Sequence, residues 1–118
     1  MQAIDRKKVR AAFASAVNMD ADEIAAWLET AESRRVGQVK AGESESIGHR
    51  SGRRIAAILG TPEPELSEDD YVHMRKVAGF VRRHRAQEPA NMVTSRWRYS
   101  LMNWGHDPLK EPAPARKD

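Results

Sequence analysis

The sequence predicts an all-α protein, a compact single-domain bundle of about five helices. Three observations support this prediction: apolar residues recur at helical spacing in several stretches, residues that cap helices precede them, and 118 residues are the length of one domain. The chain contains no cysteine, which excludes disulfide frameworks and thiolate metal sites and fits a reducing compartment. We therefore expect a cytoplasmic protein.

The first two helices are predicted from their apolar faces and start signals. Residues 5–17 are rich in alanine, and their larger apolar residues recur at helical spacing opposite a basic face. A second helix begins after Asp20, because Asp20 and Glu23 form a capping-box pattern. Its apolar residues fall on one face, and we expect Trp27, which is one of them, to lie in the core.

A polar loop is predicted near residues 33–46, which show no helical period and contain two glycines. The composition of this loop favours disorder. Helical spacing resumes in residues 45–59, and Gly60 ends that stretch. Gly48 and Gly52 lie inside this helix, where glycine costs about 1 kcal/mol relative to alanine, so we expect another helix to approach closely there.

Four hydrogen-bond donors lie beside these glycines, namely His49, Arg50, Arg53 and Arg54. Their spacing is compatible with a phosphate contact if this helix faces one. A glycine-rich phosphate loop would need more glycines in fixed register after a strand, and the segment meets neither condition.

The longest predicted helix covers residues 68–87. It follows a stiff, proline-rich linker and begins at a capping pattern formed by Ser67 and Asp70. Four cations line its polar side, and no acidic residue lies one helical turn from any of them. Because these cations would repel one another, we expect a bound anion to neutralise them. These cations are Arg75, Lys76, Arg82 and Arg83.

The last predicted helix covers residues 96–103, after a cap at Thr94 or Ser95. Trp97, Leu101 and Trp104 share one face, which we expect to be buried. The opposite strip carries Arg96, Tyr99 and Asn103.

Pro108 prevents this helix from continuing, so residues 1–110 are predicted to form the helical domain and residues 111–118 a disordered tail. The core is predicted to contain Phe13, Trp27, Ile55, Leu59, Met74, Val77, Val81, Trp97 and Leu101.

The charge distribution points to a polyanionic partner. The net charge is +3, yet residues 71–106 carry seven Lys or Arg against one acid, whereas residues 20–45 carry seven acids against three bases. A basic half of this kind attracts polyanions, of which nucleic acid is the commonest.

We therefore predict binding of double-stranded DNA, mainly through phosphates, with no cofactor. Arg75, Lys76, Arg82 and Arg83 would contact phosphates together with Arg53 and Arg54, while Arg96, Tyr99 and Asn103 would contact bases.

Two other classes of function compete with this hypothesis. In the first, the last helix and the GHDP loop after it dock a protein partner, and the cations meet an acidic surface. In the second, His49 or His106 acts in an enzyme, which we do not expect because no nucleophile motif is present. His73 and His84 lie roughly 16 Å apart along one helix and cannot share a metal ion. No stretch approaches the roughly 18 apolar residues of a membrane span.

Three segments carry a resemblance to a known family: SESIGHRSGRRIAAIL, LSEDDYVHMRKVAGFVRRHRAQEP and SRWRYSLMNWGHDPLK. They resemble a small bacterial family known only as a domain of unknown function, number thirty-one forty in its series. The likeness covers nearly the whole chain and is weakest before Val17 and after Lys110. Members are often labelled as DNA-binding proteins, so the resemblance implies DNA binding, and it implies no catalytic residues. The alanine-rich positions depart from the family's pattern and affect no predicted contact.

Overall fold

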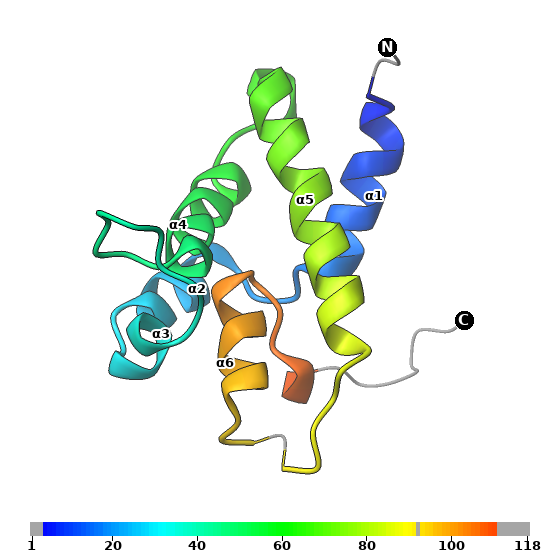
Figure 1. Ribbon diagram of the computed structural model, residues 1–118. Coiled ribbons are helices and arrows are strands. Elements are labelled where there is room, and N and C mark those ends of the chain that lie inside the picture. The colour runs from blue at the N-terminus through cyan, green and yellow to red at the C-terminus, as the bar shows by residue number, and fades with distance from the viewer. Residues whose placement is uncertain (1–3, 92, 111–118) are drawn as a thin grey trace.

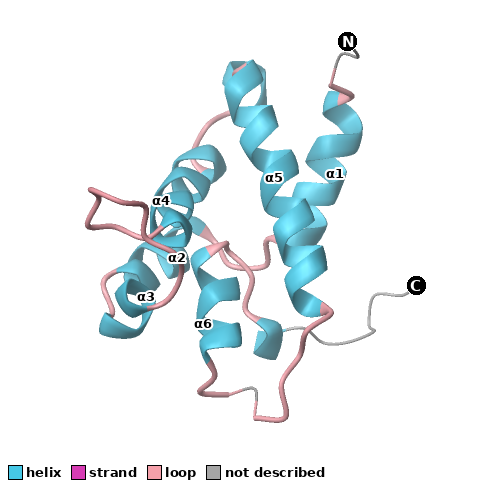
Figure 2. Cartoon of the chain, viewed as in Figure 1, coloured by secondary structure: helices cyan, strands magenta, loops and turns pink. Residues whose placement is uncertain are grey.

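The computed structural model describes residues 4–91 and 93–110, and within these ranges the protein is all-α (Figures 1 and 2). The described residues form no β-strand, only an isolated bridge between Val39 and Ser46. The predicted fold class is confirmed. In the described part of the chain the helices are α1 (Arg6–Ala16), α2 (Ala21–Leu28), α3 (Ala31–Arg35), α4 (Ile47–Leu59), α5 (Glu68–Arg85) and α6 (Arg96–Asn103), with short 3-10 turns at Glu63–Glu65 and Pro108–Lys110.

Side-chain caps fix where the helices begin. Each α-helix is preceded by an Asp, Thr or Ser whose side chain accepts a hydrogen bond from the backbone N–H three residues later. At α2 and α5 the third helical residue, Glu23 or Asp70, returns a bond to the cap and completes a capping box. These caps explain why most predicted boundaries lie within two residues of the observed ones.

Helix α3 is the element that the sequence did not predict. Thr30 caps a helix of only five residues, Ala31–Arg35, so the loop predicted near residues 33–46 begins at Val36. The remainder of that loop is attached to α4 by a backbone hydrogen bond. The backbone N–H of Ile47 donates to the carbonyl of Gln38 at 2.8 Å.

The helices form two groups with α6 between them (Figure 1). Helices α1 and α5 pack side by side, and α2 packs on α4 with α3 beside it. Helix α6 contacts members of both groups, namely α2, α3, α4 and α5. Consequently α4 and α5 stand on either side of the C-terminal end of α6.

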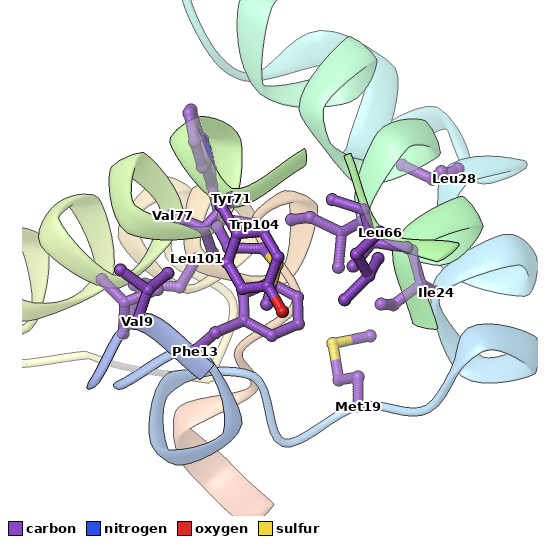
Figure 3. Packing of buried hydrophobic residues seen from close by; sticks show 14 of the residues in the cluster. Val9, Phe13, Met19, Ile24, Leu28, Leu66, Tyr71, Val77, Leu101 and Trp104 are labelled. Atoms are coloured by element: carbon purple, nitrogen blue, oxygen red, sulfur yellow. The ribbon is translucent and has the colours of Figure 1, made fainter. Parts of the chain in front are cut away.

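A continuous apolar core joins the two groups (Figure 3). Seven residues predicted for the core are buried: Phe13, Ile55, Met74, Val77, Val81, Trp97 and Leu101. Trp27 is half-buried and packs against this core. The prediction for Leu59 is wrong, because this side chain is 39% exposed. The buried line of α4 runs through Ile55 and Ile58, which turns Leu59, the last residue of the helix, to the outside.

Candidate functional site

Two adjoining hollows form a groove between α4 and α5. One has a volume of about 300 Å³ and the other about 220 Å³, and both are lined by Ile47, Lys76 and Trp104. Since they share these three residues, the hollows lie next to each other. Trp104, the residue that follows α6, forms the floor. The loop before α4 contributes Gln38 to one hollow and Lys40 to the other.

The groove is lined by cations and by no carboxylate. Its five basic residues are Lys40, Arg50, Arg54, Lys76 and Arg83, and neither hollow is lined by Asp or Glu. A concave surface of one charge sign raises the local concentration of counter-ions. The arrangement is therefore chemically suited to bind an anion.

Only some of these cations are neutralised within the protein. A nitrogen of Arg50 lies 2.6 Å from Glu43, and one of Arg54 lies 3.2 Å from Asp70. Among the residues that the structure describes, Lys40, Lys76 and Arg83 have no ion pair. These three remain available to an external anion.

Stacked rings surround Trp104 at the floor of the groove. Trp104 stacks on Phe80 with centroids 4.4 Å apart, and Phe80 stacks on His84 at 4.9 Å. His73 extends the stack at one end, 6.1 Å from Trp104, and Trp97 extends it at the other, 6.3 Å from His84. Rings from α5 thus interleave with the two tryptophans of the C-terminal segment, which fixes the position of Trp104.

A serine–histidine hydrogen bond joins the two walls of the groove. Ser51 Oγ of α4 lies 2.8 Å from His73 Nε2 of α5. Burial, reinforced by the positive charges of Arg54 and Lys76, lowers the pKa of His73 to about 4. The ring is therefore neutral near pH 7, and its Nε2 can accept the hydroxyl proton. No signal in the sequence pairs these residues, because they are 22 positions apart and meet only through the fold.

A family model matches residues 12–102 and is described as a protein of unknown function, DUF3140. The chain belongs to the DUF3140 family. The resemblance seen in the sequence is thereby confirmed. No curated protein and no solved structure matches the chain. Most of the groove falls inside the matched range, whereas Asn103 and Trp104 lie just beyond it.

The predicted cationic stripe of this DUF3140 chain divides between two sides of α5. Lys76 and Arg83 line the groove. Arg82 instead lines a separate hollow next to α1, together with His106. Arg75, one helical repeat before Arg82, is exposed. Successive residues of a helix differ by about 100° in direction, which separates each adjacent pair of cations.

The predicted phosphate ligands on α4 are held by acids. Arg53 donates two hydrogen bonds to Glu45, at 2.9 and 2.6 Å, and does not line the groove. This contact, with a hydrogen bond from His49, lowers the pKa of Glu45 to about 2 despite partial burial. Arg54 does line the groove, where Asp70 pairs with it.

The three residues of α6 that were predicted to contact bases do not form one exposed face. Asn103 is buried, with an exposed fraction of 1%, so the prediction that it faces solvent is wrong. Its amide oxygen accepts hydrogen bonds from Trp27 Nε1 and Ser33 Oγ, and its nitrogen donates to the Ser33 carbonyl. The physical reason is α3, which packs over this side of α6.

The other two members of that strip have different surroundings. Tyr99 is half-buried, and its ring centroid lies 5.5 Å from that of Trp27. Arg96 is exposed and donates to the Arg35 carbonyl at 3.4 Å. Of the three residues, Arg96 is the exposed one.

The two histidines considered for catalysis use both ring nitrogens inside the protein. His49 Nδ1 lies 2.5 Å from Glu45, and its Nε2 lies 2.8 Å from the Leu28 carbonyl, to which it donates. His106 Nδ1 lies 2.7 Å from the carbonyl of Ala16, and its Nε2 lies 3.2 Å from Arg85. Both histidines therefore connect elements of the fold.

Neither a metal cluster nor a membrane span is found in the described part of the chain. No three or more His, Asp or Glu residues gather there in a way that could hold a metal ion. None of the helices in residues 4–91 and 93–110 is long and apolar enough to cross a bilayer.

Proposed function

We propose that this chain binds double-stranded DNA through the phosphate backbone, with the groove between α4 and α5 as the main contact. The supporting observation is that five cations and no carboxylate line this groove. Lys40, Lys76 and Arg83 have no internal ion pair in the described residues, so phosphates replace only water around them. Neutralising phosphates releases condensed counter-ions, which makes such binding strongly salt-dependent.

The burial of Asn103 favours phosphate contacts over base readout. Asparagine is a typical adenine reader, but the oxygen of this buried amide already accepts two hydrogen bonds within the protein, and its nitrogen donates one. Tyr99 packs on Trp27, which leaves Arg96 as the exposed residue of the predicted base-contacting set. We therefore expect weak dependence on DNA sequence.

Two double variants on the same helix test the proposal. Lys76→Gln with Arg83→Gln removes two charges from the groove, and Arg75→Gln with Arg82→Gln removes two exposed charges outside it. Binding of a labelled duplex is measured by fluorescence anisotropy at several salt concentrations. The groove variant should lose about tenfold or more in affinity at low salt, and its salt slope should decrease by roughly 2. The matched variant should lose only about two- to threefold.

Two outcomes contradict the proposal. If the wild-type chain binds no duplex even at low salt, DNA is not the partner. If both double variants lose affinity equally, net charge rather than the groove governs binding. Circular dichroism of each variant establishes that it is folded before its affinity is compared.

An acidic protein segment is the alternative partner, since the same cations would attract it. The GHDP loop that could dock such a partner is largely occupied within the fold. Gly105, His106 and Pro108 are buried, and Asp107 accepts hydrogen bonds from Arg98 at 3.1 and 3.2 Å. The groove itself would then be the docking surface, and titration with an acidic peptide in place of DNA separates the two partners.

A further inference from the structure

The indole nitrogens of the three tryptophans differ in one respect. Trp27 Nε1 donates to Asn103 Oδ1 at 2.7 Å, and Trp97 Nε1 donates to the His84 carbonyl at 2.6 Å. Trp104 Nε1 has no acceptor among the residues that the structure describes, although the residue is only 6% exposed. Trp104 also lines the groove. A donor that is nearly buried and unmatched, at the edge of a hollow, is suited to an external acceptor.

This nitrogen faces the first turn of α4. A Cβ added at Gly48 would lie 3.1 Å from Trp104 Nε1, which is tighter than an ordinary contact. Glycine at this position therefore leaves space beside the indole N–H. Alanine at position 48 would stabilise the helix by about 1 kcal/mol relative to glycine. The lack of space for a Cβ beside the indole nitrogen is therefore the physical reason for glycine here.

The first turn of α4 adds a second unmatched donor. The N–H of Ile47 is bound by the Gln38 carbonyl, and that of His49 by the Ser46 cap. The N–H of Gly48, between them, has no acceptor in the described part of the chain. Helix α4 has 13 residues, and its N-terminus carries the positive end of the helix dipole.

Two cations complete the surroundings of this hollow. Lys76 and Arg83 line it from α5, and the hydroxyl-bearing Ser100 lines it from α6. Its volume of about 300 Å³ accommodates a tetrahedral anion with some of its water. The hollow thus combines two uncharged N–H donors with two positive charges.

We propose that this hollow, at the N-terminal turn of α4, is a binding site for one phosphate group. The N–H groups of Trp104 and Gly48 contact the phosphate oxygens, and Lys76 and Arg83 neutralise their charge. When the phosphate belongs to a nucleic-acid backbone, this site specifies one contact of the proposed DNA binding and rests on that proposed function. Free phosphate is the other source of the same chemistry.

The test uses the indole N–H resonances of the full-length chain in ¹H–¹⁵N NMR spectra. The three tryptophans give three signals, and Trp27 and Trp97 serve as internal controls because their nitrogens are already bound. Inorganic phosphate is titrated against sodium chloride at equal ionic strength, followed by a short DNA duplex. The Trp104 signal, identified by its loss in Trp104→Phe, should shift with phosphate and duplex, and the two control signals should stay.

Gly48→Ala tests the geometry without removing a charge. Its methyl group occupies the space beside the indole nitrogen, so the phosphate affinity read from the remaining shift should fall about tenfold or more. Duplex affinity should fall only a few-fold, because Lys76 and Arg83 are unchanged. Gly60→Ala, at the other end of α4, is the control, since its Cβ would make ordinary contacts only, the nearest at 3.7 Å.

The outcomes separate this site from the proposed function. A Trp104 shift with phosphate in a chain that binds no duplex supports the site and overturns DNA binding. A shift with duplex alone supports a backbone phosphate as the occupant. If chloride shifts the signal equally, or if neither phosphate nor duplex shifts it, the site is overturned even when DNA binds elsewhere. The Lys76→Gln and Arg83→Gln double variant should also weaken the shift of the Trp104 signal with phosphate. If Gly48→Ala does not fold, this double variant decides the test, and an unchanged shift overturns the proposed phosphate site.

Discussion

The two walls of the groove hold their positive charges in different ways. On α4, Arg50, Arg53 and Arg54 are each within 3.2 Å of a carboxylate oxygen. On α5, Lys76 and Arg83 have no ion pair among the described residues. Both helices carry several cations in the sequence. The difference shows that the number of cations on a helix does not measure its capacity to bind an external anion.

The glycines inside the two helices differ in how much space surrounds them. A Cβ at Gly52 of α4 would lie 2.7 Å from the Asn103 carbonyl oxygen and 2.8 Å from Leu28 Cδ2. A Cβ at Gly79 of α5 would meet only the mobile end of Arg83, at 3.0 Å. Helix α4 is therefore a tightly packed structural wall, whereas the groove side of α5 presents its side chains to solvent.

The largest expected effect is on stability, in a comparison of Gly52→Ala with Gly79→Ala. Alanine favours a helix interior by about 1 kcal/mol, but overpacking against a backbone atom costs roughly 1–3 kcal/mol. Gly52→Ala should therefore lower the free energy of unfolding by up to about 2 kcal/mol, and Gly79→Ala should leave it unchanged or raise it by up to about 1 kcal/mol. Urea denaturation monitored by circular dichroism measures both. Equal changes would show that the two walls are packed alike.

A smaller effect is expected at His73, where the walls meet. Because burial lowers its folded-state pKa to about 4 from 6.5, the neutral ring stabilises the fold above pH 6.5. This contribution is lost as the pH falls from 6.5 to 4, since the unfolded chain takes up the proton first. The loss should be about 1–2 kcal/mol, less than the full shift implies, because solvent still reaches the ring.

His73→Gln separates this titration from that of other groups. The variant cannot titrate at this position, so its free energy of unfolding should change less between pH 7 and pH 4 than that of the wild type. Urea denaturation at four or five pH values gives both curves. Parallel curves would mean that His73 is not the group responsible. The pKa of His84 is also lowered by burial, so some pH dependence should persist in the variant.

The helices were predictable where a cap and an apolar period coincide. Ser67 and the repeat of Tyr71, Met74 and Val77 define α5 in the sequence, and the structure agrees. Helix α3 has no apolar residue larger than alanine, and five residues are too few to show a helical period. The error at Asn103 follows from this omission, because the face that α3 covers looks like a free polar face.

The groove could be predicted only in part. Lys76 and Arg83 were recognised as cations without acidic neighbours, and the structure agrees. The helical step of about 100° separates them from Arg75 and Arg82, but which of the two pairs faces the groove depends on how the helices pack, which no local pattern encodes. Lys40 and Gln38 come from the loop before α4, which the hydrogen bond between Gln38 and Ile47 and the bridge between Val39 and Ser46 hold against the start of that helix. The unmatched nitrogen of Trp104 is likewise visible only once the other two indoles have found acceptors.

The smallest effect is the most direct test of the difference between the walls, and it comes from Glu45→Gln. Glu45 contacts Arg53 at 2.6 Å and Arg50 at 3.8 Å, and its loss should make α4 resemble α5. Duplex affinity at low salt should rise several-fold, and the salt slope should steepen by roughly 1 for the freed cation. Because its pKa is about 2, Glu45 is ionised at any neutral assay pH, and the gain should be the same at pH 6 and pH 8.

Glu29→Gln supplies the matched control for this gain. It removes the same charge from a residue whose side chain is 81% exposed and pairs with Arg34, which does not line the groove. If only net charge matters, the two variants should gain affinity equally. If the carboxylates that pair with the arginines of α4 hold back cations next to the groove, Glu45→Gln should gain more. A larger gain for Glu45→Gln would mean that these acids limit phosphate binding and confine it to the cations of α5 and the loop before α4.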